Sequence, residues 1–125
     1  MSLPAHARIQ AAQSFVRDVR ACGDFMRQQD AGTAEARYAR LLAQLSQGRE
    51  LLRWNPEAGR PARFLDAQSI QGRALVLQVR SLAERAGLPH VRELIIQPHV
   101  LLYAHDAAHV LLLALKHERQ LSFSL

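Results

Sequence analysis

Three short apolar runs lie end to end in the last third of the chain and constrain its fold more than any other feature. They are Val91–Ile96, Val100–His105 and His109–Lys116, separated only by Gln97-Pro98-His99 and Asp106-Ala107-Ala108. Runs of this length, rich in Val, Ile, Leu and Tyr and punctuated by Pro or Asp, are typical of strands joined by tight turns. Connections this short join only antiparallel neighbours. We therefore predict a three-stranded antiparallel meander.

Both faces of this meander are apolar. Side chains alternate along a strand, and we expect His105 to lie opposite His109 across the second turn. One face then carries His99, Leu101, Tyr103, His105, His109, Leu111, Leu113, Leu115 and His117. The other face carries Val100, Leu102, Ala104, Val110, Leu112, Ala114 and Lys116. Each face must therefore be covered by another element or by a partner.

Two amphipathic helices are predicted upstream of the meander. The first follows Ser14 as an N-cap, ends near residues 28–30, and has the apolar stripe Phe15, Val19, Cys22 and Met26. The second follows Thr33 as an N-cap and has the stripe Ala34, Tyr38, Leu41, Leu45 and Leu52. The connection between them is short, which makes the two helices an antiparallel hairpin. Its shared apolar face can pack on the sheet.

Three further segments complete the chain. Residues 6–13 alternate weakly and form either a first strand or the approach to the first helix. Residues 55–61 contain two prolines and a glycine and predict a turn-rich exit from the second helix, with Trp54 at the edge of the core. A third helix is expected within residues 66–89, capped by Ser69 or Asp66 and ended by Gly87.

Charge is unevenly distributed along the 125 residues. The net charge is +5, and the whole excess lies in the first 90 residues, almost entirely as arginine. A basic surface suits an acidic partner, either RNA or a negatively charged protein, although a solvated helix face gives the same pattern. Cys22, the single cysteine, excludes an internal disulfide and fits a buried structural thiol. We find no signal-peptide core and no membrane-length apolar stretch, so we expect a cytoplasmic protein with no membrane contact.

The chemistry-bearing residues leave two interpretations open. Tyr103, His117 and Arg119, with Arg92, are of the types that steady a phosphate and move a proton in RNA cleavage. Alternatively, Tyr103 is a packed strand aromatic, and His117 and Arg119 face solvent or a protein partner. The histidine spacing matches no standard zinc site. The sequence contains no Gly-rich phosphate loop, paired-cysteine motif or nucleophile elbow, so we expect neither metal nor cofactor.

Four segments resemble motifs of the RelE/ParE toxin superfamily, the toxins of bacterial toxin–antitoxin pairs. They are the Pro-Gly-Arg segment at 55–61, "VREL" at 91–94, the turn and "V-L-Y" strand at 98–103, and "H-x-R-Q" at 117–120. The element order is similar too, and it favours a strand near residue 9. Residues 66–89 depart from the pattern, as an insertion. The fold expected is α+β: an antiparallel sheet of an N-terminal strand and the meander, packed against the helical hairpin, in a single domain over 1–125.

The resemblance also implies a function. RelE-like members cut mRNA on the ribosome with basic residues on the meander, but the matching positions here are Val91, Glu93 and Val100. Losing those cations removes transition-state stabilisation from a nuclease. The chain therefore resembles better the ParE-like branch, the plasmid stabilisation proteins, which poison DNA gyrase and have no accepted hydrolytic site.

This resemblance implies a growth-inhibiting toxin of a type II system that is held in a hetero-oligomer by a cognate antitoxin. The antitoxin's C-terminal segment would lay apolar side chains into grooves and acidic ones onto the candidate partner-binding residues Arg60, Arg92, Lys116 and Arg119. Two alternatives stay open. One is a RelE-like endoribonuclease that acts on the ribosome and mRNA with Tyr103, His117 and Arg119 as catalytic residues. The other is a degenerate, non-toxic member that still binds an antitoxin.

Overall fold

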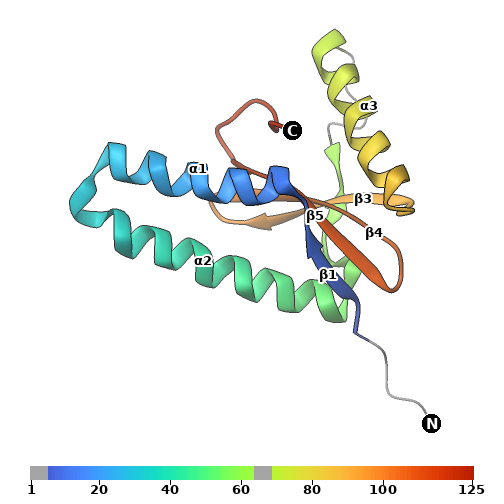
Figure 1. Ribbon diagram of the computed structural model, residues 1–125, viewed down its shortest axis with the longest axis horizontal. Coiled ribbons are helices and arrows are strands. Elements are labelled where there is room, and N and C mark those ends of the chain that lie inside the picture. The colour runs from blue at the N-terminus through green and yellow to red at the C-terminus, as the bar shows by residue number, and fades with distance from the viewer. Residues whose placement is uncertain (1–5, 64–68) are drawn as a thin grey trace.

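The computed structural model describes residues 6–63 and 69–125, and the predicted fold class is confirmed. A helical hairpin lies on one face of a sheet, and a third helix projects from the other side (Figure 1). The elements in chain order are β1 (Arg8–Ala11), α1 (Gln13–Gln29), α2 (Ala31–Trp54), η1 (Pro56–Ala58), β2 (Arg60–Pro61), α3 (Ile70–Arg85), β3 (His90–Ile96), β4 (His99–His105) and β5 (His109–His117).

The sheet has five strands in the order β1-β5-β4-β3-β2. The predicted meander is confirmed, because β3, β4 and β5 pair antiparallel in succession. The first strand forms as well, and it runs parallel to β5, so the sheet is antiparallel except at that edge. The opposite edge is the two-residue strand β2, which pairs with β3 and comes from the segment predicted only as a turn-rich exit.

A bulge in β5 changes the faces that alternation predicts. Leu102 lies opposite Ala114, whereas the next residue, Tyr103, lies opposite Leu112. Leu113 is therefore the extra residue of a β-bulge, in which two residues on one strand oppose one on its partner. The carbonyl of Leu113 is not left unpaired, since the Ser14 hydroxyl donates to it over 2.5 Å.

The expected pairing of His105 with His109 across the second turn is wrong. His105 lies opposite Val110 instead. Between the second turn and the bulge, the two faces of β5 are consequently exchanged. Val110 and Leu112 share the core with Tyr103, while Leu111 and Leu113 join the opposite cluster.

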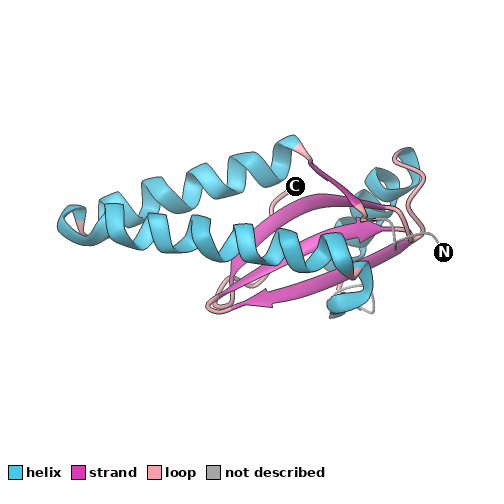
Figure 2. Ribbon diagram, turned by 90° about the horizontal axis from the view of Figure 1, so that it is seen from below, coloured by secondary structure: helices cyan, strands magenta, loops and turns pink. Residues whose placement is uncertain are grey.

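The hairpin covers the first face of the sheet, as predicted (Figure 2). Its buried residues Phe15, Met26, Ala34, Leu41, Leu45 and Leu52 pack with sheet residues such as Leu101 and Leu112. Both predicted N-caps are wrong. Ala12 precedes α1 without a side-chain cap, and the Asp30 carboxylate, not Thr33, caps α2 by accepting from the N–H of Gly32.

The second face is covered by α3 and the C-terminal segment. Val79 and Ala83 from α3 and Phe123 from the tail join a buried cluster with Val100, Leu102 and Ala104. Ser69 caps α3 as predicted, and Gly87, with φ of 71°, follows its end. The alternative cap, Asp66, lies outside the described residues. Over the area under these segments, the second face is therefore covered by elements of the chain itself.

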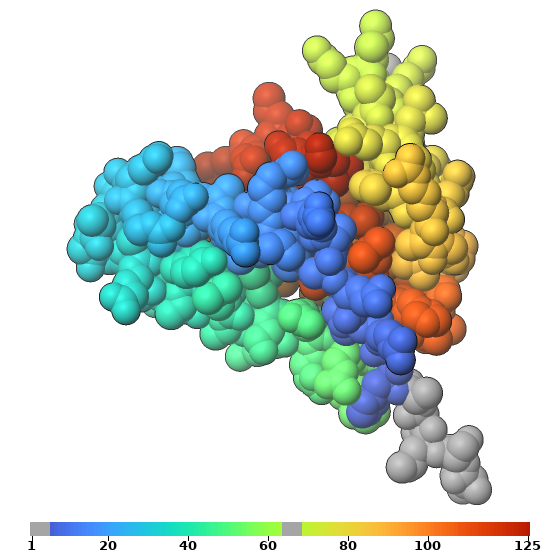
Figure 3. Space-filling model, in the orientation of Figure 1, coloured from blue at the N-terminus to red at the C-terminus, as the bar shows by residue number. Residues whose placement is uncertain are grey.

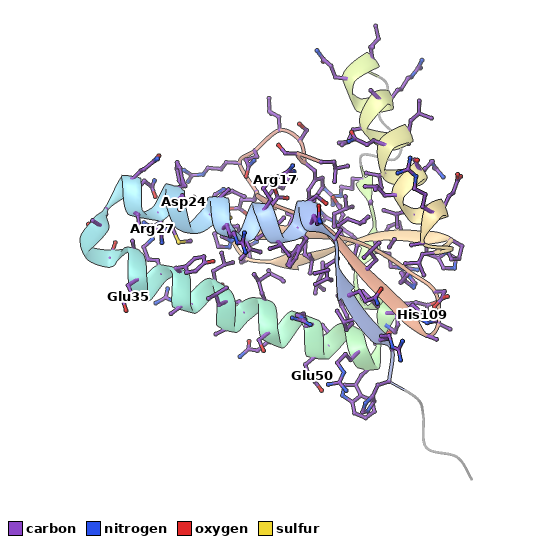
Figure 4. The ribbon with its side chains drawn as sticks, viewed as in Figure 1. Arg17, Asp24, Arg27, Glu35, Glu50 and His109 are labelled. Carbon is purple, nitrogen blue, oxygen red and sulfur yellow. The ribbon has the colours of Figure 1, made fainter. Side chains whose placement is uncertain are left out.

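Trp54 does not fill the edge of the core as expected. Its side chain is 58% exposed, its Nε1 donates to the Glu50 carboxylate, and its ring lies against His6. Ion pairs such as that of Arg27 with Asp24 also lie on the exposed surface of the hairpin (Figure 4).

Among the described residues, no helix combines the length and the apolar character that crossing a bilayer requires.

The contact between Ser14 and the bulge yields a stability prediction. Ser14→Ala removes the donor to the Leu113 carbonyl, and we expect a loss of about 1 kcal/mol in the free energy of unfolding. Ser46→Ala on the exposed face of α2 is the matched control, since it makes the same chemical change without that hydrogen bond. Urea unfolding of both variants measures the difference. Equal stabilities would mean that the Ser14 bond does not support the bulge.

Candidate functional site

Tyr103 is fully buried, and its hydroxyl is both a hydrogen-bond donor and an acceptor. It donates to the carbonyl of Pro56 over 2.6 Å and accepts from the N–H of Gly59 over 2.9 Å. A Cβ at Gly59 would lie 2.7 Å from this hydroxyl and 2.5 Å from the carbonyl oxygen of Glu93, so only glycine fits there. Burial also raises the pKa of Tyr103. This candidate catalytic residue thus fastens the loop after α2 to the sheet.

Arg92 is held in the same polar cluster. Its Nε donates to Nε2 of His105 over 3.0 Å, and one terminal nitrogen donates to the carbonyl of Gly59 over 3.0 Å. Because arginine can only donate, Nε2 of His105 must be unprotonated. The His105 proton then lies on Nδ1, which is 3.1 Å from the carbonyl oxygen of Asp106. Arg92 is therefore committed to an internal contact.

Glu93 is a buried carboxylate on the second face of the sheet. Its Oε1 accepts from Nε of Arg60 over 3.1 Å and from the N–H of Arg63 over 3.3 Å. The Glu93 side chain is only 6% exposed, whereas that of Arg60 is 39% exposed. Much of the charge of Arg60 is thus neutralised inside the protein.

His117 and Arg119 lie at the other end of the meander from Tyr103. The N–H of Arg119 donates to Nδ1 of His117 over 3.1 Å, and His117 lies opposite His99. Tyr103 is four residues beyond His99 on β4, which is about 13 Å along a strand. The structure therefore brings His117 and Arg119 together but does not add Tyr103 to them.

A groove on the second face contains two of the four candidate partner-binding residues. We call this cavity of about 1150 Å³ the tail groove, because it lies between α3 and the C-terminal segment. Figure 3 shows these two parts rising next to each other from the surface. Arg60 and Lys116 line the tail groove together with Arg63, Leu75, Ile95, Leu121 and Phe123.

A second cavity, of about 720 Å³, lies between the helical hairpin and the end of the meander. Arg119, the third candidate, lines this hairpin pocket together with His99 and His117. The sequence analysis did not single out the pocket residues Phe25, Arg37 and Arg40. Only knowledge that the hairpin overhangs the end of the sheet would have identified them.

The histidines form no evident metal centre. His109 lies at the far turn of β5 and contacts the carboxylate of Asp106 over 3.2 Å (Figure 4). Over residues 6–63 and 69–125, no group of three or more His, Cys, Asp or Glu side chains is placed to share a metal ion.

These features define a small α+β protein with a tail groove and a hairpin pocket. The candidate catalytic residues Tyr103, His117 and Arg119 do not come together in either cavity. Residues 9–122 match the family described as the ParE toxin of the type II toxin–antitoxin system parDE. The chain therefore belongs to the ParE toxin family, which confirms the resemblance to the RelE/ParE superfamily and to its ParE-like branch. No curated protein matches the chain.

The buried histidines yield a pH prediction. Burial lowers the pKa of both His99 and His105 below the ordinary value near 6.5. The unfolded chain therefore binds more protons than the folded chain as the pH falls below that value. We expect the free energy of unfolding to fall between pH 7.5 and pH 5.5, as followed by urea denaturation.

His105→Gln tests the contribution of the polar cluster to this slope. Glutamine retains an acceptor for Arg92 but does not titrate, so the variant should lose less stability than the parent over the same interval. An identical slope in both proteins would mean that His105 is not responsible.

Proposed function

We propose that this toxin acts by binding a cellular target such as DNA gyrase, without cutting RNA, and that a cognate antitoxin neutralises it. The observation that carries the proposal is the separation of the candidate catalytic residues. Tyr103 is buried with its hydroxyl occupied, whereas His117 and Arg119 lie about four strand residues away. A positioned proton donor and acceptor must reach one reacting group together, which this spacing does not favour.

The charges on the second face also support binding over phosphate chemistry. Glu93 presents a carboxylate where a nuclease would need a cation, and Val100 offers no polar group. Arg60 is paired with Glu93, and Nζ of Lys116 donates to the carbonyl of Gln120 over 3.0 Å. A developing negative charge would therefore meet one buried carboxylate and cations that are already engaged.

The tail groove is the surface that we assign to the antitoxin. Its lining combines the cations Arg63 and Lys116 with the exposed apolar side chains of Ile95 and Leu121. A segment with acidic and apolar side chains complements such a groove in charge and in hydrophobicity. The resulting complex would be a hetero-oligomer, and the proposal places it in the cytoplasm with its target.

His117→Ala separates target binding from ribonuclease activity. The proposal predicts that expression of the variant inhibits growth and induces a DNA-damage reporter as strongly as the parent does, because no step uses the imidazole. Growth curves, the reporter and mapping of mRNA ends measure these outcomes. Loss of growth inhibition together with loss of mRNA cuts would favour the ribonuclease.

Arrest of growth is itself required, since the degenerate alternative predicts none. Purified toxin should inhibit DNA supercoiling by gyrase in a dose-dependent assay. Normal growth on strong expression, with tight binding to the antitoxin, would instead identify a non-toxic member.

Charge reversal in the tail groove tests the antitoxin surface. Lys116→Glu and Arg63→Glu should each weaken binding to the product of the adjoining reading frame by about tenfold. Arg20→Glu, on exposed α1 surface outside the groove, makes the same charge change and should leave the affinity unchanged. Calorimetry on the purified proteins gives the three affinities. Equal weakening by all three would indicate only a response to net charge.

A further inference from the structure

The hairpin pocket is lined by groups that the proposed function does not use. Apolar residues from α1 form part of the lining, including Met26, which is buried, and Phe25, which is 58% exposed. Basic residues come from two sides, with Arg37 and Arg40 on α2 and Arg119 after β5. Its volume of about 720 Å³ falls within the usual range for small-molecule sites.

His99 is the least explained residue of this pocket. It is only 6% exposed, and its Nδ1 is a buried polar atom with no hydrogen-bond partner among the described residues. Buried polar atoms almost always have a partner. The Nδ1 atom is itself inaccessible from the cavity, whereas the ring of His99 forms part of the cavity wall. His117 lies beside it, with ring centroids 5.4 Å apart.

His117 supplies a hydrogen-bond donor to the hairpin pocket. Its Nδ1 already accepts from the N–H of Arg119, so the neutral ring carries its proton on Nε2. No hydrogen bond to that Nε2 is formed within the described residues. The cavity therefore offers imidazole groups from two adjacent strands next to a guanidinium.

The charge balance of the lining favours an anion. The lining contains three arginines and one carboxylate, that of Asp18. The Asp18 carboxylate is buried, accepts from the N–H of Leu115 over 2.9 Å and lies 3.8 Å from the side chain of Arg17. Arg37 is fixed by its hydrogen bond to Gln29 over 3.0 Å, whereas the guanidinium of Arg40 has no partner in the described part of the chain. Arginine forks match phosphate oxygens well, and three cations suit a dianion better than a single carboxylate.

We propose that the hairpin pocket binds a small organic phosphate. The phosphate is held by Arg40, Arg119 and the imidazole Nε2 of His117, and the apolar body of the ligand contacts Phe25 and Met26. This site lies in a different cavity from the tail groove, so its ligand does not occupy the surface assigned to the antitoxin.

Phenyl phosphate is the probe, because it combines a phosphate with an apolar ring. Titrated into the isotopically labelled full chain, it should produce saturable NMR shifts at the ring carbons of His99 and His117. Inorganic phosphate, which has no apolar body, and phenylacetate, which has a single carboxylate, should both bind more weakly. Absence of saturable shifts, or equal affinity for either of these two compounds, would overturn the proposal.

Matched variants test the placement of the anion. Arg40→Gln and Arg119→Gln each remove a charge-assisted hydrogen bond and should weaken phenyl phosphate binding about tenfold. Arg49→Gln, on exposed α2 surface outside the pocket, should leave the affinity unchanged. All three side chains are exposed, so backbone spectra should show intact folds. If Arg49→Gln weakened binding equally, the effect would reflect only net charge, and the assignment of the phosphate to Arg40 and Arg119 would be overturned.

Discussion

Burial of β4 on both of its faces is the constraint on which the rest of the structure depends. All seven residues of the strand are buried, and it pairs with β3 on one side and β5 on the other. Such a strand requires two covers, and the chain supplies the hairpin on one face and α3 with Phe123 on the other. The bulge at Leu113 lets β5 contribute large side chains to both clusters.

The same burial explains why reactive residue types here are structural. Inside the sheet, a tyrosine hydroxyl or a guanidinium must find hydrogen-bond partners, because an unpaired polar group costs about 1–3 kcal/mol. Tyr103 and Arg92 meet this requirement on the loop at Gly59, which they fasten to the sheet. Groups fixed in this way are poorly placed to take part in a reaction with an external substrate. Their residue types are compatible with catalysis, but their contacts show that Tyr103 and Arg92 hold the loop and the sheet together.

Periodicity predicted the meander, the hairpin and the third helix, because those elements repeat an apolar pattern along the chain. It did not predict the bulge, since every residue from 110 to 115 is apolar and either register looks acceptable. The Ser14 cap failed because its hydroxyl bonds to a strand that follows 99 residues later. Arg40 was missed for a similar reason: sequence shows that it points outward but not that the end of the sheet lies opposite.

The two cavities are joined physically at the end of β5. Lys116 lines the tail groove and His117 lines the hairpin pocket, as alternation along a strand requires of adjacent residues. Gln120 binds both, since its carbonyl accepts from Lys116 and its side-chain oxygen accepts from the N–H of His117. A ligand that moves either residue therefore changes a contact of the other. Any coupling between an antitoxin on one face and an anion on the other has its shortest path through this turn.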